Sequence, residues 1–289
     1  MTYLVERPAR RQVLNFRGLD FQFYRWDGDD PRPVFLLHGW GDCGETYQFV
    51  VDRLPRDRTF IAYDARGFGR TAWPRDGYWF PDYLADLDAI LASLSPDQPV
   101  DLVGHSMGGN VALLYAGVRP ERIRRLVSLE GFGMTATQPS AAPGRYREWL
   151  DELRDDDTRF AVYDDFAHFV KILGRRNPRT PPDRIEFVAQ SWGQARDDGR
   201  IELRADPRHK RVNPVLYQLE QAEACWQQVT APVTMVAGDQ SDFFKRLASR
   251  ERLSALFKSI RFETIAGAGH MMHYERPAEV AELIAAALP

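Results

Sequence analysis

Short, continuous apolar runs recur along the chain and are separated by stretches long enough for a helix. Uninterrupted apolar runs of this kind are typical of β-strands buried on both faces of a sheet. Near the N-terminus, Phe21 and Phe23 alternate with more polar neighbours, which predicts two short strands over residues 11–26 around Arg17 and Gly18. The apolar runs predict further strands at residues 33–37, 59–63, 99–103, 125–129, 233–237 and 260–265.

Helical periodicity fills several of the intervals between these runs. Between Tyr83 and Leu94, apolar residues recur at the three- and four-residue spacing of an amphipathic helix. Residues 107–118 and 278–288 predict two more helices. Because strands that alternate with helices form a parallel sheet covered on both faces, we predict a protein of the α/β class.

The alternation of strands and helices stops between residues 132 and 215. This stretch contains several prolines, clusters of charged residues and the helix-like piece Tyr146–Arg154, but no clear buried strand. We therefore predict a helical cap at 132–215, inserted into a core domain made of residues 1–131 and 216–289. Its aromatic residues are no denser than in the whole chain, so they do not by themselves predict an apolar pocket.

The charge balance argues against a nucleic-acid partner. The 289 residues include 38 Lys and Arg and 41 Asp and Glu, and the arginines are interleaved with acids rather than gathered in a basic stripe. No apolar run reaches the length of a membrane span, and the N-terminus lacks the apolar core of a signal peptide. We expect a cytoplasmic enzyme with a small-molecule substrate and no membrane partner. The sequence gives no indication of an oligomeric state.

A candidate nucleophile lies at the end of one predicted strand. Gly104-His-Ser106-Met-Gly108 has the pattern G-x-S-x-G and stands between the strand at 99–103 and the helix at 107–118. Glycines on both sides of a serine suit a turn that is too tight for side chains and that exposes the hydroxyl. A serine hydroxyl needs a base to become an effective nucleophile, so the pattern requires partners elsewhere in the chain.

His270 is the predicted base, because it follows the last predicted strand in Gly267-Ala-Gly-His270. Two acids are candidates for orienting it. Asp242 gives the chain order Ser, Asp, His, although it also suits the N-cap of a helix over residues 243–257. Glu130 ends the strand at 125–129 and could reach the same histidine. We favour Asp242 over Glu130, with Asp239 third.

Backbone amides near Ser106 are candidates for an oxyanion hole. The amide of Trp40, in His38-Gly-Trp-Gly41, and that of Met107 are the predicted donors. His38 and His105 lie inside motifs, where structural roles are favoured, and His273 is a candidate for the pocket wall. The three histidines are retained as pocket candidates. We predict no metal and no cofactor.

Taken together, these motifs resemble those of the α/β-hydrolase superfamily, and most closely its bacterial members related to serine hydrolase-like proteins. The resemblance rests on His38–Gly41, the Asp64–Gly69 segment, Gly104–Gly109, the Gly238–Asp242 segment and Gly267–His270, in that order. It implies an eight-stranded, mostly parallel sheet with the site at its C-terminal edge under a helical cap. It also implies that Asp64–Gly69 is a structural turn.

The predicted function is hydrolysis of a carboxylic ester or related small acyl compound through a Ser-His-Asp triad and an acyl-enzyme. Related members of the superfamily suggest alternatives on the same triad, namely carbon–carbon bond hydrolysis and cofactor-free oxygenation. A ligand-binding receptor without turnover is an alternative of another class. In dehalogenase-like members the acid sits where this chain has Glu130, which keeps the acid assignment open.

Overall fold

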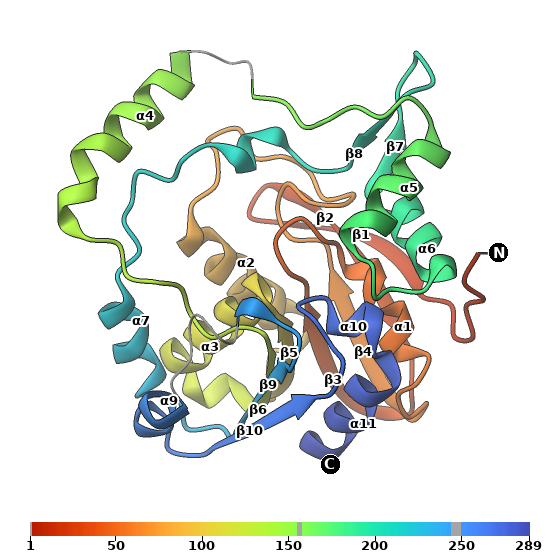
Figure 1. Cartoon of the computed structure of the whole chain (residues 1–289). Helices are drawn as coiled ribbons and strands as arrows, with labels where there is room; N and C mark the ends of the chain where they lie inside the picture. The colour runs from red at the N-terminus through yellow and green to blue at the C-terminus, as the bar shows by residue number, and fades with distance from the viewer. Residues whose placement is uncertain (1, 155–157, 244–249) are drawn as a thin grey trace.

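The computed structural model describes residues 2–154, 158–243 and 250–289 (Figure 1). The strands are β1 (Arg10–Phe16), β2 (Leu19–Trp26), β3 (Asp30–Leu37), β4 (Arg58–Tyr63), β5 (Val100–His105), β6 (Ile123–Leu129), β7 (Gly193–Ala195), β8 (Ile201–Leu203), β9 (Val233–Gly238) and β10 (Ile260–Ile265). The helices are α1 (Gln48–Val51), α2 (Phe80–Leu94), α3 (Met107–Val118), α4 (Ala142–Arg154), α5 (Phe166–Arg176), α6 (Pro182–Trp192), α7 (Leu219–Trp226), α9 (Arg250–Leu256), α10 (Met272–Glu275) and α11 (Pro277–Ala287).

The described strands form one eight-stranded sheet, in the order β1-β2-β4-β3-β5-β6-β9-β10, and a separate two-stranded hairpin. The β1–β2 and β2–β4 pairs are antiparallel, and the pairs from β4 to β10 are parallel. The mostly parallel α/β sheet that the sequence predicts is therefore confirmed. The carboxyl ends of β3, β5, β6 and β9 meet at one edge, where parallel sheets usually carry their sites.

Helices cover both faces of the sheet, as Figure 1 shows. In β3, Phe35 and Leu37 point into a cluster on one face, to which α2, α3 and α7 contribute. Val34 and Leu36 point into the cluster on the other face, with side chains of α1, α10 and α11. Burial on both faces explains why the strands read as continuous apolar runs.

The chain between β6 and β9 differs from the prediction in one respect, because it contains the β7–β8 hairpin as well as helices. Each of these strands has only three residues, too few to produce a recognisable apolar pattern. Helices α5 and α6 pack through Phe169 and Val188 against Phe49 and Tyr274 of the core. Helix α4, by contrast, has no buried residue and stands apart at the upper left of Figure 1.

The helix predicted over residues 243–257 lies partly outside the described residues, since 244–249 are not described. Its later part is α9. Within the described ranges, no helix combines the length and the apolar character needed to cross a membrane.

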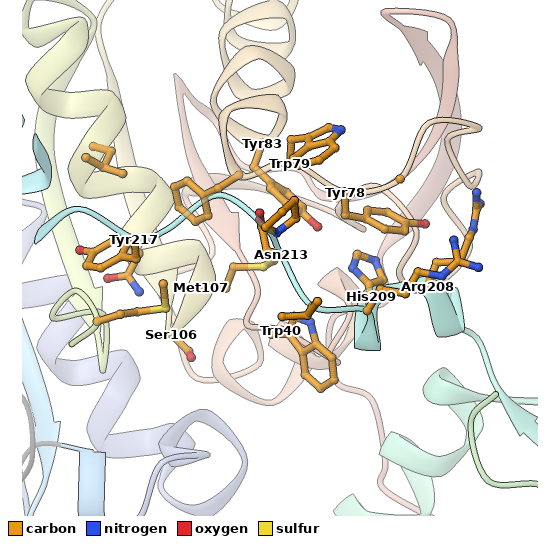
Figure 2. Close-up of a pocket in the computed structure, with 18 of the residues that line it drawn as sticks. Trp40, Tyr78, Trp79, Tyr83, Ser106, Met107, Arg208, His209, Asn213 and Tyr217 are labelled. Atoms are coloured by element: carbon orange, nitrogen blue, oxygen red, sulfur yellow. The ribbon is translucent and has the colours of Figure 1, made fainter. Parts of the chain in front are cut away.

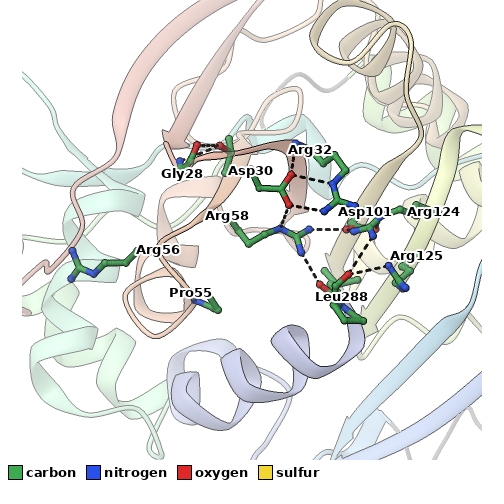
Figure 3. Close-up of polar contacts among 12 residues, drawn as sticks. Gly28, Asp30, Arg32, Pro55, Arg56, Arg58, Asp101, Arg124, Arg125 and Leu288 are labelled. Carbon is green, nitrogen blue, oxygen red and sulfur yellow. Dashed lines mark hydrogen bonds and ion pairs between the residues drawn. The ribbon is translucent and has the colours of Figure 1, made fainter.

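The N-terminal edge of the sheet contains a cluster of ion pairs around Asp101, the second residue of β5 (Figure 3). The buried Asp101 carboxylate accepts hydrogen bonds from Arg58 of β4, at 2.9 Å, and from Arg124 of β6. Arg58 also donates to the carbonyl of Leu288, at 2.7 Å. The cluster joins three strands of the sheet, β4, β5 and β6, to the C-terminal residues, at the edge opposite the carboxyl ends of the strands.

Candidate active site

Ser106 occupies a sharp turn between β5 and α3. Its backbone has φ +51° and ψ −113°, a conformation that non-glycine residues rarely adopt. Its amide donates to the carbonyl of Leu129 in β6, at 2.8 Å, and its carbonyl accepts from Asn110 in α3. The turn is thus fixed between a strand and a helix, as the G-x-S-x-G pattern predicts.

The two motif glycines are required by close backbone approach. A Cβ at Gly104 would overlap the carbonyl of Gly108, and a Cβ at Gly108 would overlap the carbonyl of Leu37. The second overlap shows that the elbow lies directly against the end of β3. The chain after β3 is therefore brought to the nucleophile by the packing of the elbow itself.

His270 lies between Ser106 and Glu130. Its Nε2 is 3.1 Å from Ser106 Oγ, and its Nδ1 is 3.2 Å from Glu130 Oε2. The carboxylate fixes the ring proton on Nδ1, which leaves Nε2 free to accept the serine hydroxyl. The imidazole stacks on Phe243, with ring centroids 4.3 Å apart, and its side chain is 26% exposed. The imidazole is therefore partly accessible to a substrate, while Glu130 fixes the orientation of the ring.

Glu130 is held rigidly at the end of β6. Its carboxylate is fully buried and accepts from the amide of Gly238, at 2.8 Å, and from Ser241 Oγ, at 2.5 Å. Its backbone has φ +57°. Among the described residues, only Arg17, Ser106 and Glu130 are non-glycine residues with positive φ, so two of the three lie in this contact chain. Such conformations cluster at functional sites.

The structure places Glu130, and not Asp242, against His270, which corrects the preference drawn from the sequence. Asp242 is exposed, and it forms no hydrogen bond or ion pair with any described residue. In the turn after β9 the inward position belongs to its neighbour Ser241, which is 2% exposed and bonds Glu130. Asp239, the third candidate, is also exposed and accepts from the amide of Gly267.

The predicted oxyanion donors both lie beside the elbow. Met107 is the first residue of α3, so its amide has no acceptor within the helix. Trp40 is in the loop after β3, and a Cβ at Gly39 would lie 3.2 Å from Ser106 Cβ. The loop that carries the Trp40 amide therefore passes in contact with the nucleophile.

The three histidines predicted as pocket candidates do not line the main cavity in the part of the chain that the structure describes. They are His38, His105 and His273. All three are buried behind it. His38 accepts from the amide of Ala65 and donates to the carbonyl of Gly39, which fixes the loop after β3. His105 donates through Nε2 to the carbonyl of His270, at 2.8 Å. These histidines support the site from inside the core.

Asp42, His105 and His273 are the described group closest to a metal-ligand arrangement, with ligand atoms within 4.8 Å of one another. The Asp42 carboxylate already accepts from His273 at 3.0 Å and from Tyr274 at 2.5 Å. It also accepts from Thr46, Trp192 and the amide of Cys43. Burial alone would raise the pKa of Asp42, but the hydrogen bond and charge of His273 hold it well below its usual range. The carboxylate is thus satisfied by protein donors.

A cavity of about 910 Å³ opens at Ser106 (Figure 2). Such a volume suits a small-molecule ligand. It is lined by core residues, including Tyr217 before α7, and by residues of the 132–215 segment, including Trp149 of α4. In Figure 2, Trp40 lies between Ser106 and His209. Aromatic side chains dominate its wall: Trp40, Tyr78, Trp79, Phe80, Tyr83, Trp149, Tyr217, Trp226 and Phe243.

Sequence reasoning missed most of this aromatic wall because it examined only the predicted insertion. Of the nine rings, Trp149 alone lies within residues 132–215. Tyr78, Trp79 and Phe80 form an uninterrupted aromatic run that leads into α2, of which Phe80 is the first residue. That run is the signal that could have indicated the cavity.

His209 lines the main cavity, on the far side of Trp40 from Ser106 in Figure 2. Its ring stacks between Phe68 and Tyr78, at centroid distances of 3.8 and 3.5 Å. Burial lowers the pKa of His209 to about 3, and the charge of Asp206 opposes that shift only in part. The cavity therefore has a neutral imidazole in its wall.

Comparisons with known proteins agree with this architecture. A family model described as the alpha/beta hydrolase fold matches residues 32–277. The serine hydrolase-like protein of Danio rerio is 27% identical over 274 residues, which cover 90% of this chain and 82% of that protein. The 3-hydroxybutyrate-oligomer hydrolase of Cupriavidus necator is 25% identical over 284 residues, 93% of this chain and 94% of the relative.

Among solved structures, the thioesterase domain from the curacin biosynthetic pathway aligns with a TM-score of 0.81 at 25% identity. The alignment covers 96% of this chain and 98% of that domain. By name these relatives are hydrolases or hydrolase-like, and the thioesterase domain shares the fold. On the family model and on the fold, the chain belongs to the α/β hydrolase fold family.

Proposed function

We propose that the protein is a serine hydrolase that cleaves a carboxylic ester or a related acyl compound through an acyl-enzyme. The observation that carries the proposal is the contact chain Glu130–His270–Ser106, with distances of 3.2 and 3.1 Å. A nucleophile bonded to a base, which is in turn oriented by a buried acid, is the arrangement that acyl transfer requires.

In this mechanism Ser106 Oγ attacks the substrate carbonyl while His270 Nε2 takes the hydroxyl proton. His270 then gives the proton to the leaving group, and water repeats the sequence on the acyl-enzyme. Glu130 holds the ring tautomer and stabilises the imidazolium that forms. The amides of Trp40 and Met107 are the donors to the tetrahedral oxyanion, where one donor typically contributes about 10²–10³ in kcat.

The form of the cavity supports an acyl substrate with substantial apolar surface. Its volume of about 910 Å³ and its aromatic wall suit a bulky organic group next to Ser106. Met134, Trp149 and Tyr217 reach the cavity from the chain that follows β6. We propose that residues 132–215 act as a cap over the site.

The relatives support an acyl hydrolase among the reactions that this fold performs. One is named a 3-hydroxybutyrate-oligomer hydrolase, and a structural neighbour is a thioesterase domain. Ester and thioester hydrolysis use the same nucleophile, base and oxyanion donors, so one site can serve both.

Labelling by a fluorophosphonate probe tests the proposal without knowledge of the natural substrate. We expect the wild-type protein to be labelled rapidly and Ser106→Ala not at all. Ser140→Ala, which changes an exposed serine after β6, is the matched control and should label like the wild type. Absence of wild-type labelling, together with inactivity on p-nitrophenyl esters and thioesters, would favour a ligand-binding protein instead.

A further inference from the structure

A second cavity, of about 430 Å³, shares Trp40 with the main one. Trp40 lines both cavities and is 53% exposed. The short helical turn Pro207–Lys210 forms a second shared wall, because Arg208 and His209 line the main cavity and Lys210 lines this one. The two cavities are therefore neighbours, and they share the Trp40 indole and the turn Pro207–Lys210 as walls.

Three cationic side chains line the second cavity, namely Arg176 at the end of α5, Arg204 after β8, and Lys210. Its one carboxylate is Asp42, which is fully buried and already accepts from five protein donors. Aromatic rings, including Tyr163 and Trp192, form much of the remaining wall. The cavity thus combines apolar surface with positive charge that its own lining does not neutralise.

Arg204 is the most unusual of these cations. It is half-buried, and its Nε is buried without a hydrogen-bond partner among the described residues. No described carboxylate lies within 4.0 Å of its guanidinium, whereas the partly buried Arg58 pairs with Asp101 at 2.9 Å. Burial, followed by the nearby charge of Arg70, lowers the pKa of Arg204. A desolvated guanidinium without a carboxylate costs free energy unless a ligand completes it.

We propose that the second cavity binds a terminal carboxylate of the substrate, so that the enzyme prefers esters bearing a carboxylate over matched neutral esters. This inference rests on the proposed function, because it assumes that the ester is cleaved at Ser106. The planar guanidinium of Arg204 matches a carboxylate in shape and charge. Arg176 and Lys210 add attraction at longer range, and the apolar part of the substrate lies along Trp40.

The test compares two series of p-nitrophenyl esters of graded chain length. One series is derived from dicarboxylic acids with a free terminal carboxylate, and the other has that carboxylate capped as a methyl ester. Because hydrogen bonds to charged groups are strong, we expect kcat/KM at the best length to favour the free carboxylate by about 10-fold to 100-fold. In 0.5 M NaCl the preference should shrink.

Arg204→Gln should remove most of this preference, because KM should rise for the free-carboxylate esters. The value of kcat/KM for the neutral esters should stay as in the wild type. Arg176→Gln, at an exposed position, should lower the preference less and tests the same cavity without risk to folding. Arg200→Gln changes an exposed arginine of the same hairpin that does not line the cavity, so both series should behave as in the wild type. A wild-type ratio near one, or an equal loss on both series in Arg204→Gln, would overturn the proposal.

Equilibrium binding separates this inference from the proposed function. In the Ser106→Ala background, the free-carboxylate ester should bind about tenfold or more tightly than its methyl ester, and Arg204→Gln should abolish the difference. If the wild type hydrolyses none of these esters, the proposed function fails. The dissociation constants of the two esters still show whether the second cavity binds a carboxylate. Equal dissociation constants for the two esters would contradict the carboxylate site. So would a site from which inorganic phosphate displaces both esters equally well.

Discussion

Two neighbouring strands, β5 and β6, carry buried acids at opposite edges of the sheet, and the two acids have different hydrogen-bond partners. At the N-terminal edge, Asp101 of β5 is held by the guanidinium groups of Arg58 and Arg124. At the C-terminal edge, Glu130 follows β6 and is held by an amide, a hydroxyl and an imidazole. Asp101 is neutralised by permanent cations, whereas the donors of Glu130 leave its charge available to His270.

This difference separates a carboxylate that holds the fold from one that serves chemistry. A carboxylate paired with arginines gives most of its electrostatic attraction to them, and removing it leaves buried cations. A carboxylate held by neutral donors is fixed in place and can stabilise an imidazolium that forms during reaction. Substitution of Glu130 should therefore lower activity, whereas substitution of Asp101 should lower the free energy of unfolding.

The largest effect should follow loss of the nucleophile or the base. Ser106→Ala and His270→Ala should each lower kcat on p-nitrophenyl butyrate by about 10⁴–10⁶, while the free energy of unfolding changes little. Because residues that act as one unit are strongly non-additive, the double variant should be scarcely worse than either single one. Losses that multiply in the double variant would show that the two residues act independently.

The next effect concerns the acid. Glu130→Gln should lower kcat by about 10³–10⁴, because the amide no longer fixes the tautomer or stabilises the imidazolium. Asp242→Asn is the matched control in the turn after β9, and its exposed side chain should matter tenfold or less. Thermal melts of both variants check that the fold is retained. If well-folded Asp242→Asn proves the more damaged enzyme, the acid of the site is not Glu130.

At the opposite edge, Asp101→Asn should leave kcat/KM nearly unchanged but lower the free energy of unfolding by about 3 kcal/mol. The reason is that Arg58 and Arg124 would remain partly buried without their carboxylate. Urea denaturation provides the measurement. Asp27→Asn removes an exposed ion pair with Arg25 and should have little effect. If Asp101→Asn lost activity but not stability, Asp101 would not differ from Glu130 in the way proposed.

The smallest effect tests the burial of an ionisable side chain, that of His209 in the cavity wall. Its pKa is about 3 in the folded protein, against an ordinary value of 6.5, so below pH 6.5 the unfolded chain binds the proton more readily. Its contribution is therefore present above pH 6.5 and is lost as the pH falls towards 3. Between pH 6.5 and 4.5, we expect the wild type to lose about 1 kcal/mol per pH unit more than His209→Phe. Parallel stability curves for the two proteins would contradict this assignment.

The sequence predicted the parts of the fold that depend on local pattern. The core strands, the α2, α3 and α11 helices and the elbow at Ser106 follow from apolar runs, helical spacing and glycine positions, and each is present. The β7–β8 hairpin was missed, because three-residue strands leave no periodic trace. The division into a core and a cap at 132–215 stays a prediction.

The candidate site was predictable in its nucleophile and base but not in the direction of its side chains. Asp242 follows the expected chain order, yet the residue that faces inward in its turn is Ser241. Which of two consecutive residues points to the histidine depends on the backbone path after β9, which no local pattern reveals. The aromatic wall was missed for a similar reason, since the run at Tyr78 meets Ser106 only through tertiary packing.

The most direct test of the central claim, that Glu130 and not Asp242 orients His270 for attack by Ser106, is the rate of labelling by a fluorophosphonate probe. This rate reports activation of the serine and needs no knowledge of the substrate. We expect Glu130→Gln to be labelled about 10³-fold more slowly than the wild type, and Asp242→Asn to be labelled within tenfold of it. Labelling of Glu130→Gln at the wild-type rate, or a greater loss of rate in Asp242→Asn, would show that Glu130 does not orient His270.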